Sequence, residues 1–162
     1  MAISVDEFKA GMSRRAAGVA IVTARSGETV HGMTVTDFNG VSADPPLALV
    51  CADKSSNTLA VIREGCCFAI NLLSVDQVDL SNKFASKKHE HERFDGLDCG
   101  TGVTGAPLIP DAVASLDCAL EAEHDAGDHV IFVGRIEQFV QRDLEPLIYL
   151  SGSYGRLAPL GE

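Results

Sequence analysis

The sequence has no run of basic residues and no apolar segment long enough to span a membrane. Its 162 residues include 13 Lys and Arg against 23 Asp and Glu, which gives a formal charge of −10. A chain this acidic is not expected to bind nucleic acid or an anionic membrane. Charged residues within an amphipathic pattern at positions 1–24 do not fit a signal peptide, so we expect a cytoplasmic protein. The expected partner is a small molecule or another protein.

Cysteine spacings typical of metal or redox motifs are also absent. Five cysteines, at positions 51, 66, 67, 99 and 118, include no C-x-x-C pair. An odd count in a chain without a secretory signal fits reduced thiols. Cys66 and Cys67 are adjacent in an expected strand, so their side chains should point to opposite faces and cannot share a metal ion.

A histidine pair flanks the expected turn at 124–129. We expect a four-residue turn in which Gly127 has a positive φ and the imidazoles of His124 and His129 face each other. Further ligands with suitable spacing are missing, so no metal site is predicted. The alternatives are two solvated histidines, or one histidine beside an anionic or amide-bearing ligand.

The segment 100–105 matches the dinucleotide motif G-x-G-x-x-G, but its surroundings do not fit. No strand precedes it, and Pro110 follows too closely for a useful helix. We interpret it as a glycine-rich surface loop that leads into a strand. No G-x-S-x-G nucleophile elbow, internal repeat or linker is found, and we expect one domain over residues 1–162.

The order of elements predicts a mostly β protein. Capping boxes at Ser4 and Ser74 begin two helices, the first with Val5, Phe8 and Met12 on one face and ending near Gly18. Strands are expected at 19–24, 29–36, 47–51, 66–73, 113–123, 129–140 and 147–151. We expect the strand 47–51 to be buried on both faces and 113–123 to have one wet face with Asp117. This order favours a closed or partly closed antiparallel barrel with few helices.

The segment after the 47–51 strand has the chemistry of a phosphate site. Ser55 or Ser56 is the expected N-cap of a short helix, and Gly65 its left-handed C-terminal residue. Free amides, the helix dipole, the hydroxyls of this segment and the ammonium of Lys54 would then converge on one point. An ordinary serine-capped helix with a solvated lysine is the competing interpretation.

Motifs spread along the chain resemble the flavin reductase family, the small NAD(P)H:flavin oxidoreductases that serve two-component flavin monooxygenases. They are G-M-T-V at 32–35, Phe38, V-S at 41–42, D-P-P at 44–46, S-S-N-T at 55–58, F-A-I-N-L-L at 68–73, F-A at 84–85, G-A-P-L at 105–108 and G-D-H at 127–129. The resemblance runs in order from about Phe8 to Leu157. It implies a homodimeric FMN-binding split barrel with FMN or FAD at the subunit interface and NADH or NADPH as co-substrate.

The resemblance also implies which residues form the site. The flavin-binding positions would be Thr34, Val35, Thr36, Asp37, Phe38 and Asn39 along the ring, Cys51, Ala52, Asp53 and Lys54 beside the ring and ribityl chain, Ser55, Ser56 and Thr58 at the phosphate, and Lys83 and Phe84 on a nearby helix. The nicotinamide side would have His129, Tyr154 and Arg156, with His129 orienting NADH or neutralising part of its charge.

The expected chemistry is hydride transfer from nicotinamide to flavin, which asks the protein mainly for stacking and exclusion of water. Asp37 and Asn39 depart from the small or hydroxyl residues of the family. A carboxylate near the flavin would oppose its reduction, so Asp37→Ala is expected to tighten flavin binding. The alternatives are a non-catalytic flavin-binding electron-transfer protein on the same barrel, a pyridoxamine-phosphate type of oxidase, and a structural protein without a ligand.

Overall fold

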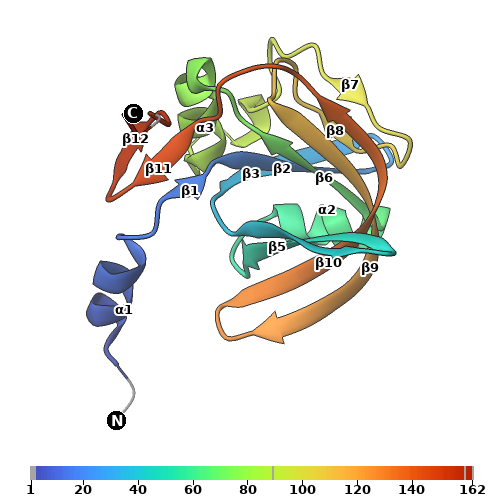
Figure 1. Ribbon diagram of the computed structural model, residues 1–162. Coiled ribbons are helices and arrows are strands. Elements are labelled where there is room, and N and C mark those ends of the chain that lie inside the picture. Colours follow the sequence, from blue (N-terminus) through green and yellow to red (C-terminus); the bar gives the residue numbers. More distant parts are fainter. Residues whose placement is uncertain (1–2, 89, 159, 162) are drawn as a thin grey trace.

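The protein folds as a strongly curved antiparallel sheet with a few short helices (Figure 1), and the computed structural model describes residues 3–88, 90–158 and 160–161. The helices and 3₁₀ turns are α1 (Val5–Met12), α2 (Thr58–Gly65), η1 (Val75–Gln77), α3 (Val78–Ala85) and η2 (Glu90–Glu92). The strands are β1 (Ala17–Gly18), β2 (Ala20–Ser26), β3 (Thr29–Val35), β4 (Phe38–Ala43), β5 (Pro46–Asp53), β6 (Cys67–Leu72), β7 (Gly100–Thr101), β8 (Pro107–Leu108), β9 (Ala114–Ala126), β10 (His129–Gln141), β11 (Ile148–Leu150) and β12 (Ser153–Gly155).

Seven strands form the main sheet in the order β3-β2-β6-β9-β10-β5-β4, and all neighbours are antiparallel. The sheet curls until β3 contacts β5, but in the described part of the chain no ladder joins the edge strands β3 and β4. The barrel is therefore split. A small sheet of β1, β11 and β12 and the β7–β8 hairpin complete the fold. The prediction of a mostly β, antiparallel split barrel is confirmed.

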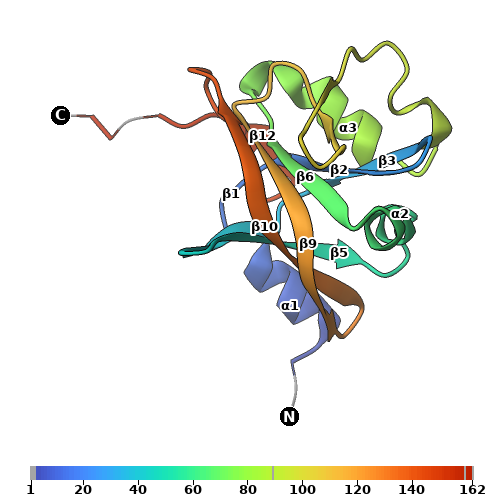
Figure 2. The same ribbon diagram turned by 90° about the vertical axis from the view of Figure 1, so that its right-hand side faces the viewer.

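The strand β2 is buried on both faces and separates two hydrophobic clusters. On one face, Val22 belongs to a cluster with Phe68 and with Ile62 of α2. On the other face, Ile21 belongs to a cluster with Phe84 of α3. The helices α2 and α3 thus cover opposite faces of β2 (Figure 2).

The prediction that 47–51 is buried on both faces is wrong. In β5, buried and half-buried residues alternate, with Ala48, Val50 and Ala52 in the core. The intervening residue Cys51 is half-buried because it faces a cavity described below.

The first helix begins as predicted but ends early. The Ser4 amide donates to the Glu7 carboxylate at 2.8 Å, and the Glu7 amide donates to Ser4 Oγ at 3.2 Å, which completes the capping box. The helix ends at Met12, not near Gly18, and none of its residues is buried. The predicted apolar face is therefore exposed. No helix in the described residues is long and apolar enough to cross a membrane, and a cytoplasmic location stays a prediction.

The C-terminal end of α2 corrects another expectation. The left-handed position is taken by Cys66, with a φ of 52°, and Gly65 is the last helical residue. A Cβ on Gly65 would lie 1.9 Å from the carbonyl oxygen of Arg25, so glycine allows α2 to approach β2 closely. Cys66 is exposed and Cys67 is buried.

The face of β9 that was expected to be solvent-exposed contains a buried carboxylate. Asp117 is fully buried and accepts hydrogen bonds from the amide of Thr104, at 2.8 Å, and from its hydroxyl. These donors come from the glycine-rich segment 100–105, which forms β7 and the turn toward β8 and opens no helix. The segment that matches the dinucleotide motif is therefore a loop that supplies hydrogen-bond donors to the buried carboxylate of Asp117.

Candidate active site

Three adjoining cavities form a groove along one side of the barrel. The histidine cavity, about 570 Å³, lies between α1, the β3–β4 turn and the β9–β10 hairpin, and His129 lines it. The tyrosine cavity, about 340 Å³, is lined by Tyr154 and shares Thr36 with the histidine cavity. The arginine cavity, about 210 Å³, is lined by Arg93 and shares Thr34 with the tyrosine cavity.

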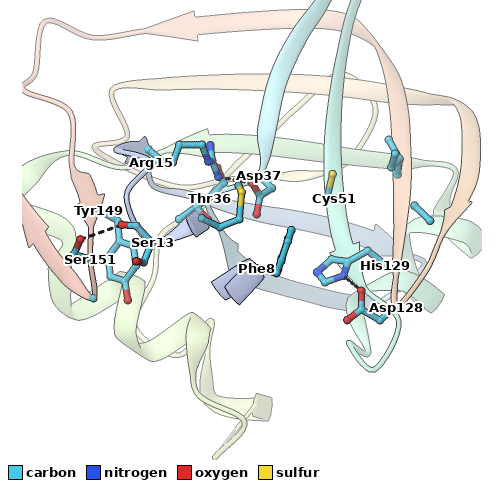
Figure 3. Close-up of a pocket in the computed structure, with 15 residues that line it drawn as sticks. Phe8, Ser13, Arg15, Thr36, Asp37, Cys51, Asp128, His129, Tyr149 and Ser151 are labelled. Carbon is cyan, nitrogen blue, oxygen red and sulfur yellow. Dashed lines mark hydrogen bonds and ion pairs between the residues drawn. The ribbon is translucent and has the colours of Figure 1, made fainter. Parts of the chain in front are cut away.

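The tip of the β9–β10 hairpin presents His129 to the histidine cavity (Figure 3). The hairpin turns through two residues, Gly127 and Asp128, because Ala126 pairs directly with His129. Gly127 has the expected positive φ, 65°. The prediction of a four-residue turn with facing imidazoles is wrong, since His124 pairs with Ile131.

Asp128 holds the imidazole of His129, with 2.7 Å between Asp128 Oδ1 and His129 Nδ1. This hydrogen bond keeps the pKa of Asp128 below its ordinary value, so the carboxylate is charged at neutral pH. The imidazole is partly exposed and lines the cavity, so a bound ligand could contact its other nitrogen. Among the described residues, no group of three or more His, Cys, Asp or Glu side chains could hold a metal ion.

An ion pair between Arg15 and Asp37 forms the opposite wall of the histidine cavity (Figure 3). Arg15 comes from the segment between α1 and β1, and it also donates to the Thr36 carbonyl at 3.4 Å. The carboxylate of Asp37 is thus neutralised by a neighbour. Burial, and then the Asp37 charge, raise the pKa of the Cys51 thiol, so this cysteine stays protonated at neutral pH.

The start of α2 differs from the expected phosphate cradle. Asn57, not Ser55 or Ser56, is the N-cap, and its side chain makes no capping hydrogen bond. Four backbone amides around the helix start already have acceptors within the chain: Ser55 donates to Asp53 Oδ1 at 2.7 Å, Ser56 to the Asp53 carbonyl at 2.9 Å, Thr58 to Ser56 Oγ at 3.3 Å and Lys54 to the Asp128 carbonyl at 3.0 Å. These amides do not converge on an open point.

Two side chains expected at the phosphate are also committed elsewhere. Thr58 is fully buried, and its hydroxyl lies 2.7 Å from His31 Nδ1. The ammonium of Lys54 forms an ion pair with Asp125 of the β9–β10 hairpin. Neither residue lines one of the three cavities.

The cationic groups at this end of the groove are Lys87 and Arg93. The ammonium of Lys87 donates to Ser55 Oγ at 3.1 Å, and both side chains line the arginine cavity together with Ser56. Arg93 is only 3% exposed, and it donates to the Gly32 carbonyl at 2.8 Å and to the Ser86 carbonyl. Its Nε has no hydrogen-bond partner among the residues that the structure describes.

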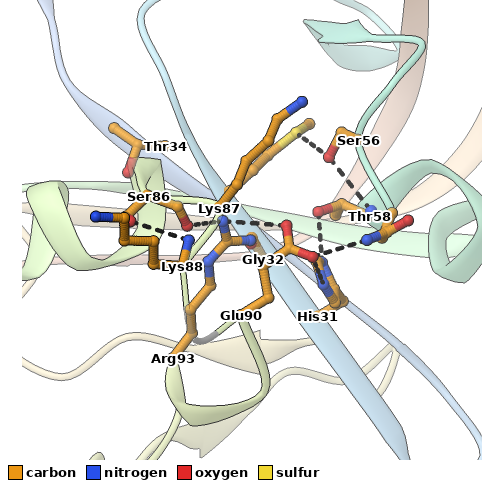
Figure 4. A network of polar contacts seen from close by, with 12 residues as sticks. His31, Gly32, Thr34, Ser56, Thr58, Ser86, Lys87, Lys88, Glu90 and Arg93 are labelled. Carbon is orange, nitrogen blue, oxygen red and sulfur yellow. Dashed lines mark hydrogen bonds and ion pairs between the residues drawn. The ribbon is translucent and has the colours of Figure 1, made fainter.

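Glu90 ties this region together (Figure 4). One carboxylate oxygen lies 3.2 Å from Arg93 Nη2, and the other accepts from the Asn57 amide at 2.7 Å. His31 Nε2 is 4.0 Å from the same carboxylate. Burial lowers the pKa of His31, and Glu90 opposes this shift only in part, so the neutral imidazole is favoured.

Comparison with known families matches residues 12–158 to the flavin reductase like domain. The chain belongs to this family. The FMN reductase (NADH) SmoA of Agrobacterium fabrum is 40% identical over 151 residues, which cover 93% of this chain and 85% of SmoA. The flavin-dependent monooxygenase reductase subunit HsaB of Rhodococcus jostii is 30% identical, over 98% of this chain and 80% of HsaB.

A solved structure supports the same assignment. The NADH:FAD oxidoreductase SgcE6 of Streptomyces globisporus, in complex with NAD and FAD fragments, superposes with a TM-score of 0.89. It is 31% identical, over 97% of this chain and 94% of SgcE6. The prediction of a flavin reductase family enzyme is confirmed.

In this flavin reductase, the groove brings together more than half of the residues predicted for the site. Those that line one of the three cavities are Thr34, Val35, Thr36, Asp37, Cys51, Asp53, Ser55, Ser56, Phe84, His129 and Tyr154. The others predicted do not line them: Phe38, Asn39, Ala52, Lys54, Thr58, Lys83 and Arg156. Phe38 and Ala52 pack in the core, Asn39 is exposed, and Lys83 donates to the Asp95 carbonyl at 3.0 Å.

The three residues predicted for the nicotinamide side lie apart. Tyr154 lines the tyrosine cavity, and its hydroxyl contacts Ser81 Oγ at 2.9 Å and Asn82 Oδ1 at 3.0 Å. Arg156 pairs with Glu145 at 3.4 Å. His129 is thus the one residue of this set in the histidine cavity.

Sequence reasoning singled out neither Lys87 nor Arg93. The local pattern around Arg93 is polar and gives no sign of burial. Its partners, Gly32 and Ser86, are 61 and 7 positions away in the chain. Only the fold reveals that the arginine is enclosed.

Proposed function

We propose that the protein, as one domain over residues 1–162, reduces FMN or FAD with NADH and passes the reduced flavin to a flavin-dependent monooxygenase. The observation that carries this proposal is the row of three adjoining cavities, with Lys87 and Arg93 at one end and His129 at the other. The name of SmoA, an FMN reductase (NADH), supports the reaction. The complex of SgcE6 with NAD and FAD fragments supports the cofactors, and the name of HsaB, a monooxygenase reductase subunit, supports the partner.

The arginine cavity fits a flavin phosphate. A buried guanidinium with an unpartnered Nε, an ammonium and two serine hydroxyls line it. Charge-assisted hydrogen bonds from arginine and lysine are strong phosphate contacts. Arg93, Lys87, Ser55 and Ser56 would therefore hold the phosphate, in place of the helix amides that the sequence suggested.

The segment Thr34 to Thr36 would lie along the flavin ring. Thr34 Oγ1 donates to the Ser81 carbonyl at 2.7 Å, which fixes the end of β3 against α3. Both threonines line the tyrosine cavity and connect it to the neighbouring cavities on either side. A flat ring bound along this segment would connect the phosphate end to the histidine cavity.

The histidine cavity would receive the nicotinamide. Bound flavin supplies the acceptor for the hydride, and the protein positions the two rings and excludes water. Phe8, Met12 and Ile131 give the cavity apolar walls. His129, oriented by Asp128, would contact the dinucleotide through Nε2 and so act on its binding.

The charges of this cavity favour NADH over NADPH. Each basic side chain that lines it faces a carboxylate: Arg15 faces Asp37, and His129 faces Asp128. The extra 2′-phosphate of NADPH would need a further cation. We expect a lower KM for NADH.

The exposed face of α1 supports a homodimer. Val5, Phe8 and Met12 are 67%, 56% and 43% exposed. A helix of eight residues is unstable alone and needs a packing partner. A second copy of the chain, as the family resemblance implies, would supply it.

Steady-state oxidation of NADH with FMN, FAD and no flavin tests the proposal. We expect rapid NADH oxidation only when flavin is present. Flavin binding without NADH oxidation would instead identify a passive electron carrier. A preparation that ignores flavin would exclude both functions.

A further inference from the structure

Glu90 introduces a negative charge at the cationic end of the groove. Its carboxylate contacts Arg93 Nη2 at 3.2 Å (Figure 4). It also accepts a hydrogen bond from the side-chain amide of Asn57 at 2.7 Å. Asn57 is the N-cap of α2, where the positive end of the helix dipole lies. Glu90 thus occupies the place in front of α2 where the sequence predicts a phosphate.

The four ionised side chains that line the arginine cavity cancel in charge. Lys87 and Arg93 are positive, and Asp53 and Glu90 are negative. Hydrogen bonding by the Ser55 side chain, and then by the Ser55 amide that donates to Asp53 Oδ1, lowers the pKa of Asp53. A phosphate that enters the cavity would meet two cations and two fixed carboxylates.

One buried donor still points to a ligand. Arg93 is 3% exposed, two of its nitrogens donate to carbonyl groups, and its Nε has no partner within residues 3–88, 90–158 and 160–161. An unpaired buried donor is costly, so this nitrogen gains from an incoming acceptor. The cavity therefore has a donor for an anion, but the carboxylates of Asp53 and Glu90 already offset its positive charges.

We infer that Glu90 is a built-in counter-anion that competes with the flavin phosphate for Arg93 and the start of α2. It weakens the hold on a doubly charged phosphomonoester, as in FMN, more than on the singly charged phosphates of FAD. We therefore expect FAD to be favoured over FMN. This inference rests on the proposed function.

Equilibrium binding of riboflavin, FMN and FAD to wild type and E90Q tests the competition. Quenching of flavin fluorescence gives each dissociation constant. Removing one negative charge from the cavity is expected to lower the dissociation constant of FMN about tenfold or more and that of FAD by a smaller factor. The dissociation constant of riboflavin, which has no phosphate, should not change. The matched control is E92Q, in the same 3₁₀ turn but outside the cavity lining, and it should bind all three flavins like wild type.

Two results would overturn the inference. Unchanged FMN affinity in E90Q would show that Glu90 does not act on the phosphate. Equal tightening of riboflavin and FMN would show that it acts on the ring or the fold instead. Circular dichroism checks folding, and if E90Q fails to fold, Glu90→Ser, which admits water beside Arg93, is measured against the same expectation.

The proposed function fails by a different result. If wild type with flavin oxidises no NADH, the reductase proposal is wrong whatever E90Q does. If wild type is active and E90Q binds FMN as wild type does, only the role of Glu90 is wrong.

Discussion

The pair formed by Arg93 and Glu90 allows a quantitative test of how the groove is held together. The Arg93 side chain is 4% exposed and that of Glu90 is 25% exposed. Breaking a buried ion pair by removing one partner costs about 3–5 kcal/mol. For Arg93→Met we expect the lower end, about 3 kcal/mol, because water reaches Glu90 in part and screens the charge that remains.

Arg93→Met also removes the hydrogen-bond donors of two carbonyl groups, those of Gly32 and Ser86. Glu90→Gln should cost less, about 1–2 kcal/mol, because the new amide oxygen can still accept from Arg93. In the double variant neither charge is left unpaired. Its loss of stability should therefore be smaller than the sum of the single losses by about 1–2 kcal/mol.

Urea unfolding of the wild type, two single variants and the double variant measures this coupling. The chain has no tryptophan, so far-UV circular dichroism is the suitable signal. Protein concentration is kept constant, since the stability of the proposed homodimer would depend on it. Additive losses, within about 0.5 kcal/mol, would refute the view that the two charges stabilise each other.

Three further predictions concern other residues. His129→Gln should raise the KM for NADH about tenfold, which corresponds to the loss of one hydrogen bond, with little change in kcat; a selective fall in kcat would contradict a binding role. The depressed pKa of His31 means that the unfolded chain binds a proton near pH 6.5 before the folded protein does, so stability should fall as the pH drops below about 7, by at most about 1.4 kcal/mol per pH unit. His31→Gln should reduce this slope in urea unfolding measured from pH 7.5 to 5.5, whereas the exposed His124→Gln should not; equal slopes in all three proteins would exclude His31 as the cause. Burial raises the pKa of Cys118 to about 12, whereas Cys66 is exposed, so a thiol reagent at pH 8 should label Cys66 fast and Cys118 only after unfolding. Loss of the fast phase in Cys66→Ser checks this assignment, and rapid labelling of Cys118 in the folded protein would contradict it.

Local signals in the sequence were sufficient for most elements of the fold. The capping boxes at Ser4 and Ser74 involve residues three positions apart and are both present. The hairpin of β2 and β3 follows from two β-branched runs around a turn with Gly27. Each of these features depends on neighbours along the chain, so the amino-acid order by itself determines them.

The candidate site was predicted less completely, because several of its side chains have partners that only the fold brings near. Thr58 has the composition of a phosphate ligand, but His31, 27 positions earlier, takes its hydroxyl. The ammonium of Lys54 is taken by Asp125 from a distant hairpin. A sequence motif shows which groups are present and not which of them are already satisfied.

The sequence by itself determined the mostly β order, the family and a groove residue such as His129. Only the tertiary structure decided that Arg93 is buried with a free Nε, that Glu90 stands at the start of α2, and that the apolar face of α1 is exposed. The physical reason is that periodicity and capping report contacts within a few residues. Burial and charge pairing depend on which distant segments the closing sheet places side by side.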